Sequence, residues 1–354
     1  MDKRRITIND IAEHSGVSRS TVSLVLQGHP RIPQATGDKV RRSMAELGYT
    51  YNRAAANLRR QTSQAIGLIV NDLRNPFFAE LTSAIQARVE NEGYFVYLVE
   101  SGEDLDRQER LLQSLVEHGV AGLVVCPATA TPGDAFDRQL AAGIPLCLAV
   151  RPHPDQRIDY AGSDNYGGAL MATRHLVEAG HRRIAFLGGQ QENPVRVDRL
   201  AGYFSALQGG GIPFDPALVT DSRPTLHSGA DDLKTVLALA QPPTALLCYN
   251  DYVAIGVMHA LRCNGLVPGE DIAVVGFDGM PETAVTFPPL STVELHGQAV
   301  GERAAELLLA RIADPSRSPA RHVEQATLIA RSSSAPQRTT APGDGDRTGL
   351  PKRR

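Results

Sequence analysis

Side chains that could read DNA bases gather in one short stretch near the N-terminus. The region Ile8–Leu26 predicts a short amphipathic helix, a tight turn at Gly16 and a second short helix that begins at Ser18. Two helices joined by a short glycine-containing turn form a helix-turn-helix, whose second helix enters the major groove. Hydroxyl and guanidinium groups bond base edges there, whereas a leucine offers only contact with a thymine methyl group. The side chains that this second helix would project outward are Arg19, Ser20, Ser23 and Leu24.

A third helix would complete a small three-helix domain. It is expected from about Pro33 to Leu47, with Gly48 as its C-cap, while Thr7 and Ser18 are the expected N-caps of the first two helices. The apolar side chains spaced to pack inward are Ile8, Ile11, Ala12, Val17, Val22, Val25, Leu26, Val40, Met44 and Leu47. The alternative interpretation is a small surface bundle that binds no ligand.

The distribution of charge favours the DNA-binding interpretation. Residues 1–62 hold eleven Lys and Arg against five Asp and Glu, a net charge of +6. The whole chain carries −3, so the remaining residues carry −9. A basic head on an acidic body is the pattern expected when the head meets phosphate groups.

The segment from Tyr49 to Gln64 predicts a short helix within a basic linker. A helix of about two turns is marginal in water, so it would need a partner in order to form. Leu58 lies among basic residues with no evident core to join, and on DNA such a leucine can wedge into the minor groove and kink the duplex. The alternative is a plain flexible linker in which Leu58 has no role.

Length and composition restrict the class of protein. The chain has 354 residues, of which 42% are hydrophobic, and this suits two or three globular domains. No apolar run approaches the roughly 20 residues of a membrane helix, and no apolar signal segment follows the N-terminus. Of the four cysteines, Cys126, Cys147 and Cys248 lie in apolar, strand-like runs, which predicts buried free thiols and a reducing cytoplasm.

The body of the chain alternates apolar runs with amphipathic stretches. The expected strands are Ala65–Val70, Phe95–Val99, Gly122–Cys126, Pro145–Val150, Arg183–Leu187, Ala245–Cys248 and Ile272–Gly276. The expected helices are Phe77–Glu92, Leu105–His118, Gly167–Ala179, Leu200–Gln208, Ala230–Ala240 and Val253–Asn264. Such alternation predicts parallel sheets with helical crossovers, and its length predicts two lobes. Ligands of these folds lie at the carboxyl ends of strands, here in the cleft between the lobes.

Polar residues that follow the expected strands are therefore the candidates for a ligand site. Asn, Asp and Arg side chains beside aromatic rings suit a sugar, because each sugar hydroxyl both donates and accepts a hydrogen bond. The expected effector-binding residues are Asp72, Phe77, Phe78, Arg151, Asp164, Asn193, Arg199, Asn250 and Asp278. For Asn71, Asp164 and Asn250 the alternative role is that of a helix cap.

Other chemistries find little support in the sequence. There is no phosphate-binding GxxxxGK[ST] loop, no HExxH motif, no GxGxxG after the first expected strand and no GxSxG elbow. The ten histidines show no metal-ligand spacing. We therefore expect no catalytic residues, no metal and no cofactor.

Several motifs together resemble the LacI family of bacterial transcriptional regulators. The matching segments are Thr7–Ser23, Leu47–Tyr49, Asn52, Leu58–Arg59, Ile66–Ile69, Asn75–Phe78, Gly180–Ala185, Arg199 with Gly202–Tyr203, Asn250–Asp251 and Val275–Asp278. They extend over nearly the whole chain to about Arg331. Thr21–Leu26, Arg31–Ile32, Ala35–Gly37 and Asn52–Arg53 resemble the maltose regulon repressor branch of the family.

The resemblance implies a homodimer that carries one helix-turn-helix per subunit, a hinge helix that orders on operator DNA, and a sensor like the periplasmic sugar-binding proteins. The residues expected at the DNA are Thr7, Ser18, Arg19, Ser20, Thr21, Ser23, Leu24, Asn52, Asn57, Leu58 and Arg59. The chain departs from the family pattern at Tyr51, where a proline is usual, at Ala56, and at Leu24, which lacks a hydrogen-bonding group. These departures affect the operator sequence rather than the function.

The expected fold is an N-terminal all-α helix-turn-helix head followed by an α/β two-lobed sensor domain like a periplasmic binding protein. The expected boundaries are 1–49 for the head, 50–64 for the hinge helix and linker, 65–331 for the sensor and 332–354 for a disordered tail. The lobes would be 65–162 with 293–322, and 163–292 with 323–331.

The expected function is cytoplasmic repression of carbohydrate-utilisation genes, with operator double-stranded DNA and a small sugar as partners. The alternatives are a sugar-binding protein without a DNA role, a regulator that responds to a non-sugar metabolite, and an enzyme of nucleotide or sugar metabolism. The basic head argues against the first, and the missing catalytic motifs argue against the last.

Overall fold

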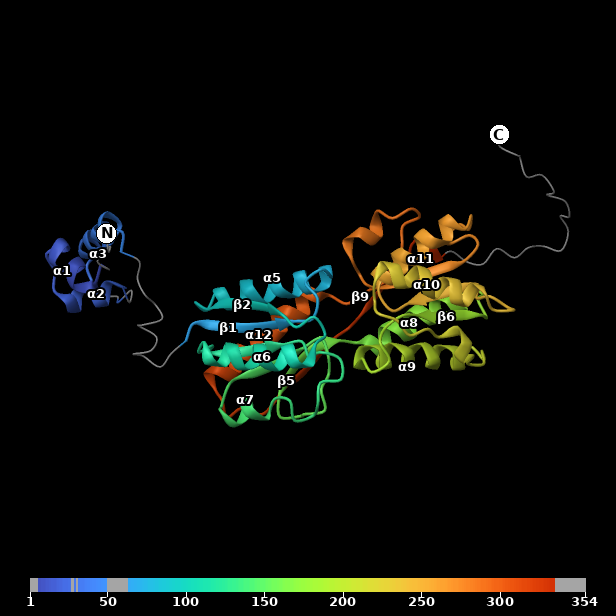
Figure 1. Cartoon of the computed structure of the whole chain (residues 1–354), viewed down its shortest axis with the longest axis horizontal. Coiled ribbons are helices and arrows are strands. Elements are labelled where there is room, and N and C mark those ends of the chain that lie inside the picture. Colours follow the sequence, from blue (N-terminus) through green and yellow to red (C-terminus); the bar gives the residue numbers. More distant parts are fainter. Residues whose placement is uncertain (1–5, 27–28, 30, 50–62, 335–354) are drawn as a thin grey trace, which may run out of the picture. The chain divides into compact units, whose positions relative to one another are not determined.

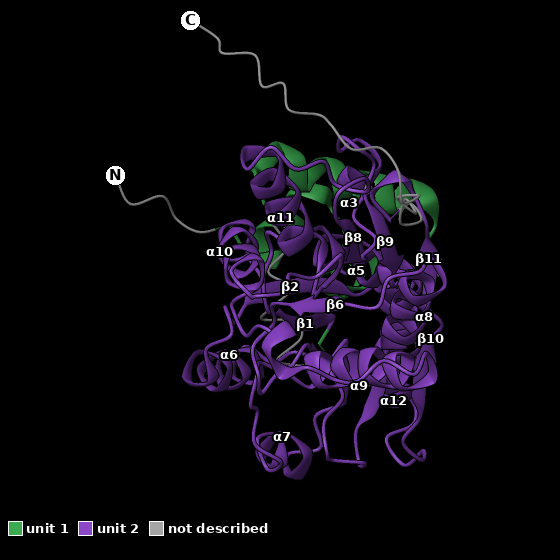
Figure 2. Ribbon diagram, turned by 90° about the vertical axis from the view of Figure 1, so that its right-hand side faces the viewer, with its two compact units in different colours: residues 1–63 green, residues 64–354 purple. Residues whose placement is uncertain are grey.

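The computed structural model describes residues 6–26, 29, 31–49 and 63–334. The chain divides into two compact units, Met1–Ser63 and Gln64–Arg354 (Figure 2). We call the described part of the first unit the head and that of the second unit the sensor. The predictions for Asn52, Asn57, Leu58 and Arg59 lie outside the described residues.

The head consists of α1 (Ile8–Ser15), α2 (Arg19–Leu26) and α3 (Gln34–Leu47). One apolar side chain from each helix is fully buried, and these three are Ile11, Val22 and Val40. The other apolar positions expected to face inward are partly buried around them. Gly16 ends α1 with a φ of 60°, a left-handed conformation that strains residues with a side chain. The predicted three-helix head, including its glycine turn, is confirmed.

The sensor contains two sheets, which define its first and second lobes (Figure 1). The first lobe has a six-stranded parallel sheet in the order β10-β5-β4-β3-β1-β2. Its strands are β1 (Ala65–Val70), β2 (Phe95–Glu100), β3 (Gly122–Val125), β4 (Leu146–Ala149), β5 (Asp159–Ser163) and β10 (Arg321–Glu324). Its helices are α5 (Pro76–Glu90), α6 (Leu105–Glu117), α7 (Asp137–Ala141) and α12 (Gly297–Ala313).

The second lobe has a five-stranded sheet in the order β11-β9-β8-β7-β6, in which only β11 runs antiparallel to its neighbour. Its strands are β6 (Ile184–Leu187), β7 (Ala245–Cys248), β8 (Ala273–Asp278), β9 (Ser291–Glu294) and β11 (Thr327–Ile329). Its helices are α8 (Asn165–Glu178), α9 (Pro194–Gly209), α10 (Leu226–Leu237) and α11 (Asp251–Cys263), with 3-10 turns at Pro216–Leu218, Pro281–Ala284 and Ser332–Ser334.

Close packing of α8 against α9 positions part of the pocket described below. At Gly202 on α9, a Cβ atom would lie 2.2 Å from the carbonyl oxygen of Tyr166, so only glycine permits this approach. Arg199 lies one turn before Gly202, and the contact brings its guanidinium to Asn165 at the start of α8.

Several elements differ from the sequence-based expectation. The sequence did not predict the strands β5, β9, β10 and β11 or the helices α7 and α12. The four strands were missed because they lack continuous apolar runs. β10, for example, alternates exposed and half-buried residues. Ser163 and Glu324 end strands of the first lobe and Glu294 ends a strand of the second, so the chain crosses between lobes slightly later than expected.

The predicted disordered tail was wrong at its first residues. Ser332–Ser334 form a 3-10 turn in which Ser333 and Ser334 are buried. The Ser333 hydroxyl donates to the Val274 carbonyl at 2.7 Å and accepts from the Ser291 amide at 2.7 Å. Residues 335–354 lie outside the described residues.

The four cysteines of the chain are all free thiols. Cys126, Cys147 and Cys248 are buried free thiols, as predicted, and Cys263 is exposed. Among the described residues, no helix is both long and apolar enough to span a membrane.

Candidate functional site

The side chains predicted to contact DNA bases lie in the first turns of α2 and just before it. Ser18, Arg19 and Ser20 are exposed, while Thr21, Ser23 and Leu24 are partly buried. The Ser18 hydroxyl accepts a hydrogen bond from the Thr21 amide at 3.1 Å and therefore caps α2. This cap leaves Arg19 and Ser20 at the leading end of the helix, where recognition helices contact bases.

Thr7 caps α1 in a similar way. Its amide donates to Oδ2 of Asp10 at 2.8 Å, and its hydroxyl donates to the same oxygen at 2.6 Å. The pair forms a capping box, which fixes the end of α1 that follows the N-terminal residues. Thr7 thus has a structural role in addition to the predicted one at DNA, which stays a prediction.

A pocket of about 590 Å³ lies between the two lobes of the sensor, within the roughly 300–1,000 Å³ usual for small-molecule sites. Eight of the nine predicted effector-binding residues line it, namely Asp72, Phe77, Phe78, Arg151, Asn193, Arg199, Asn250 and Asp278. Further lining residues include Asn71, Arg74, Asn75, Glu103, Asp104, Asn165, Arg223, Tyr249 and Tyr252. The structure therefore brings together residues far apart in sequence, such as Asn75 and Asp278, which are 203 positions apart.

Asp164 is the exception among the nine. It does not line the pocket, and its Oδ1 accepts the Gly167 amide at 2.8 Å, which caps α8. The next residue, Asn165, lines the pocket instead. Asn193 and Asn250 both cap a helix through Oδ1 and line the pocket, so the two roles are compatible at those positions.

The second lobe holds a buried ion pair between Arg199 and Asp278. Arg199 Nη2 donates to Asp278 Oδ1 at 3.1 Å, with the two side chains only 4% and 7% exposed. Arg199 Nε also donates to Asn165 Oδ1 at 2.9 Å, and Nη1 donates to the Tyr249 carbonyl. Its guanidinium lies 3.9 Å from the centre of the Phe277 ring. These contacts fix the orientation of the guanidinium before any ligand arrives.

Asp278 occupies a conformation that its neighbours must hold. Its φ is 103°, which is unfavourable for a residue with a side chain. The buried Asp251 carboxylate accepts the Met280 amide at 2.8 Å and the Thr292 hydroxyl at 2.7 Å, and so anchors the turn that follows Asp278. Burial, and then the charge of Asp278, raise the pKa of Asp251 well above its ordinary value. Burial also raises the pKa of Asp278, although Arg199 and Asn75 oppose the shift.

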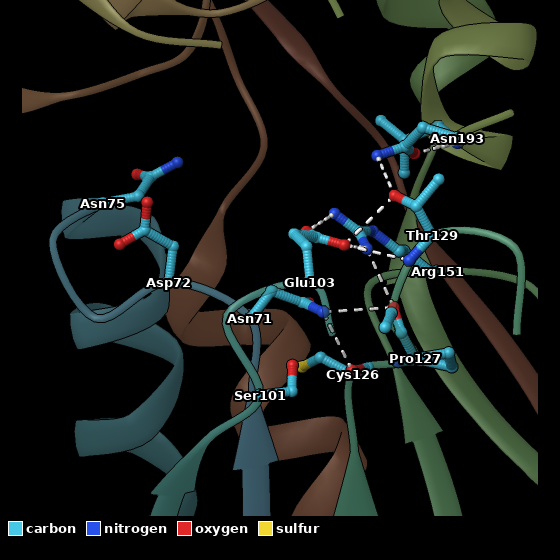
Figure 3. A network of polar contacts seen from close by, with 12 residues as sticks. Asn71, Asp72, Asn75, Ser101, Glu103, Cys126, Pro127, Thr129, Arg151 and Asn193 are labelled. Carbon is cyan, nitrogen blue, oxygen red and sulfur yellow. Dashed lines mark hydrogen bonds and ion pairs between the residues drawn. The ribbon is translucent and has the colours of Figure 1, made fainter. Parts of the chain in front are cut away.

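The first lobe holds a second ion pair, between Glu103 and Arg151 (Figure 3). Arg151 Nη2 lies 2.5 Å from Glu103 Oε1, and Nη1 donates to Oε2 at 2.7 Å and to the Pro127 carbonyl at 2.9 Å. Thr129 donates to the same carboxylate through its amide at 2.9 Å and its hydroxyl at 3.0 Å. Burial alone would raise the pKa of Glu103, but Arg151 and Thr129 outweigh it and lower that pKa.

Asn71 lies beside this pair at the end of β1. Its Nδ2 donates to the carbonyls of Cys126 and Pro127, each at 3.2 Å (Figure 3). Its buried Oδ1 has no hydrogen-bond partner within the described protein. Asn71 is a lining residue of the pocket, but this oxygen is itself occluded from it.

Three hydrogen bonds join the lobes directly at the pocket. The Tyr252 hydroxyl donates to the Arg74 carbonyl at 2.6 Å. Asn75 Nδ2 donates to Asp278 Oδ2 at 3.1 Å, and Asn193 Nδ2 donates to the Thr129 hydroxyl at 3.4 Å. The lobes therefore contact each other directly at the pocket.

Some of these residues were not predicted from the sequence. Glu103 follows the end of β2, the same position relative to its strand as the residues that were chosen, but β2 is an edge strand with an exposed face. Tyr252 lies within the first turn of α11, where the predicted helix had not yet begun. Among the described residues, no group of three or more His, Cys, Asp or Glu could hold a metal ion.

A helix-turn-helix head with a two-lobed, pocket-bearing sensor defines the class of DNA-binding regulators controlled by small molecules. The sequence pattern of the bacterial regulatory proteins of the lacI family matches residues 7–52. The pattern of the periplasmic binding protein-like domain matches residues 173–334. The chain belongs to the LacI family of bacterial transcriptional regulators.

Two relatives illustrate this membership. The maltose regulon regulatory protein MalI of Escherichia coli (strain K12) is 32% identical over 336 residues, which cover 92% of this chain and 98% of that protein. The HTH-type transcriptional regulator CelR of Thermobifida fusca is 32% identical over 339 residues, 94% of this chain and 99% of that protein. The similarity to MalI agrees with the expected resemblance to the maltose regulon branch.

Solved structures show the same architecture. The lac repressor dimer bound to operator and the anti-inducer ONPF is 26% identical, with a TM-score of 0.84 over 94% of this chain and 100% of that chain. A complex of the transcriptional regulator CelR with cellobiose is 30% identical, with a TM-score of 0.71 over 93% of this chain and 100% of that chain. The expected fold class is confirmed.

Proposed function

We propose that this protein is a homodimeric repressor of carbohydrate-utilisation genes whose operator affinity is set by a small sugar bound between the lobes of the sensor. The observation that carries the proposal is the pocket itself, in which polar side chains from both lobes converge beside Phe77 and Phe78. Cellobiose in the CelR complex supports a sugar as the class of effector.

The effector would act by stabilising one arrangement of the two lobes. A ligand shifts an equilibrium only by binding one state better than the other. Contacts with Arg151 in the first lobe and with Arg199 and Asp278 in the second would supply that difference. We propose direct roles for Asp72, Phe77, Phe78, Asn193 and Asn250 as well, whereas Asp164 serves as a helix cap.

Two heads on a near-palindromic operator follow from the small size of one head. One α2 helix presents few side chains to bases, and a dimer doubles them with matching symmetry. The lac repressor structure, a dimer on its operator, supports this arrangement.

We propose that the pocket binds rather than transforms its ligand. The named relatives are transcriptional regulators, and the carboxylates Glu103 and Asp278 are held by arginines rather than left poised for proton transfer. Operator DNA lies in the bacterial cytoplasm, which is the proposed location of the protein.

A gel-shift on the DNA upstream of the protein's own gene tests the proposal. We expect binding that is tighter than to random DNA, that weakens steeply as salt rises, and that changes when a panel of sugars is added. Salt-independent binding, or equal affinity for random DNA, would contradict the operator role. An operator complex that no sugar perturbs would contradict the sugar effector alone.

A further inference from the structure

The charged side chains that line the pocket balance one another. Among the described lining residues, four are acidic and four are basic: Asp72, Glu103, Asp104 and Asp278, with Arg74, Arg151, Arg199 and Arg223. Equal numbers alone decide little, because an unpaired arginine deep in the pocket could still bind an anion. The pairing of each buried cation is therefore the deciding feature.

Both buried arginines are neutralised by a carboxylate of the same lobe. Arg151, whose side chain is 8% exposed, forms a two-pronged pair with Glu103, at 2.5 and 2.7 Å. Arg199, whose side chain is 4% exposed, is paired with Asp278 at 3.1 Å. The fork-to-fork contact of Arg151 with Glu103 is among the strongest kinds of polar interaction in proteins, so a ligand does not displace it cheaply.

The remaining charges lie toward solvent. Arg74 forms a two-pronged pair with Asp72, at 2.8 and 3.0 Å, with its own side chain 84% exposed. Asp104 is exposed and its carboxylate caps α6 by accepting the Arg107 amide at 2.8 Å. Arg223 is exposed as well. None of these places an uncompensated positive charge in the buried part of the pocket.

The hydrogen-bond acceptors of the pocket wall favour the same conclusion. The carboxylates of Glu103 and Asp278, which line the pocket, are acceptors. Acceptors require donors on the ligand, which hydroxyl groups supply and fully ionised phosphate or carboxylate groups do not. An anionic group would also lose its hydration beside fixed carboxylates, a combination that strongly disfavours the charged form.

We propose that the pocket selects an uncharged, polyhydroxylated effector and rejects phosphorylated or acidic ones, and that Glu103 is the residue that sets this selectivity by neutralising Arg151. The inference rests on the proposed effector role of the pocket. Beyond that role, the effector must be uncharged, and Glu103 is the side chain responsible for this selectivity.

The test releases Arg151 from its partner and asks whether the pocket then binds an anion. Glu103→Gln keeps the size of the side chain and one acceptor but removes the charge. Inorganic phosphate, titrated by calorimetry at constant ionic strength into the full chain, is the first probe. We expect Glu103→Gln to bind phosphate at least about tenfold more tightly than the parent, because a buried guanidinium is left without a counter-charge.

Two variants serve as controls. Asp104→Asn removes a negative charge from the same pocket without unpairing an arginine, so it should behave as the parent does. Glu103→Gln combined with Arg151→Gln removes the released cation and should lose the gained affinity. Every variant carries the same basic head, so phosphate bound by the head contributes equally to all of them.

The second probe uses sugars in pairs that differ in charge, namely cellobiose with cellobionate and ribose with ribose 5-phosphate. The parent should prefer the neutral member, and Glu103→Gln should shift that preference toward the anionic member by at least about tenfold. If the thermal transition shows that Glu103→Gln does not fold, Glu103→Ala takes its place. The preference of the parent for the neutral over the anionic sugar then tests the same inference.

The outcomes separate this inference from the proposed function. Tighter binding of an anionic sugar by the parent, no gain of phosphate affinity in Glu103→Gln, or an equal gain in Asp104→Asn would each overturn the inference. Failure of every sugar to bind, with the phosphate results as expected, would count against the sugar effector and leave charge selection supported. Loss of operator binding by the parent would count against the proposed function alone.

Discussion

The head and the pocket of this protein present recognition chemistry in opposite ways. In the head, Ser18, Arg19 and Ser20 are consecutive, exposed and attached to one short helix. In the pocket, Arg199 and Asp278 are buried, paired with each other and 79 residues apart. A DNA-binding domain is attracted to its target by the charged phosphate backbone, so its base-contacting side chains can stay exposed to solvent. A small effector offers little surface, so the side chains that bind it must be held in position in advance.

The two regions also differ in how they are stabilised. The head has three fully buried apolar side chains, whereas the main cluster in the sensor spans both sheets and their helices. A domain with so small a core has little stability to lose.

Arg199→Ala should destabilise the sensor by about 3–5 kcal/mol, because it leaves the Asp278 carboxylate buried without a partner. Effector binding should be lost as well. The exposed Arg174 on α8 gives a matched control, since Arg174→Ala should change the stability by no more than about 0.5 kcal/mol. Calorimetric unfolding of both variants makes the measurement. Equal transitions for the two would mean that the pair contributes nothing.

Removing both charges sharpens the same prediction. Arg199→Met combined with Asp278→Leu should recover part of the stability that Arg199→Ala loses, since no uncompensated charge remains buried. Effector binding should stay lost. If the double variant is no more stable than Arg199→Ala, the loss of stability comes from lost packing rather than from the unpaired charge.

Ile11→Ala should remove operator binding while effector binding remains. The substitution truncates one of the three fully buried apolar side chains of the head, at a cost of at least about 2 kcal/mol. Glu13→Ala, at an exposed position of the same helix, is the control. Gel-shift and sugar calorimetry on one preparation provide the comparison. Loss of sugar binding in Ile11→Ala would contradict the independence of the two regions.

Arg19→Ala should weaken operator binding by about 1–3 kcal/mol without changing the stability of the head, because its side chain is exposed. Arg19→Lys keeps the charge but not the two-pronged geometry, so it should retain affinity for random DNA and lose specificity. The ratio of operator to random-DNA affinity, measured at one salt concentration, distinguishes the variants. An unchanged ratio in both would place Arg19 away from the bases.

The smallest expected effect is a dependence on pH that originates in the first lobe. The pKa of Glu103 is lowered in the folded state, so its pairing stabilises the fold above the unfolded pKa, which is about 4.3. That contribution is lost as the pH falls through the lower folded pKa. Thermal midpoints between neutral and acid pH should therefore fall less steeply in Glu103→Gln than in the parent. Parallel curves would show that the pair does not change in this range.

The head could be predicted from sequence because its information is local. Gly16, the Ser18 cap and the apolar spacing through Val22 all lie within one turn or two of the residues they position. The alternation of strands and helices likewise predicted the sensor fold. Edge strands such as β10 were missed because their pairing, rather than their composition, makes them strands.

Most residues that line the pocket could be predicted from the sequence, but the ion pairs between them could not. The rule that ligands lie past strand ends selected Arg151, Arg199 and Asp278, all of which line it. Nothing local indicated that Glu103 would reach Arg151, 48 residues away. Asp164 illustrates the remaining ambiguity, because an Asp before a helix caps it or faces a ligand according to the direction of one side chain.

The hydrogen bond from Tyr252 to the Arg74 carbonyl also bears on how fast the protein can respond. Since it joins the lobes at the pocket, this bond breaks whenever the lobes part. An effector that requires parted lobes is captured after that opening step, and its observed association rate then levels off at the rate of opening as the effector becomes abundant.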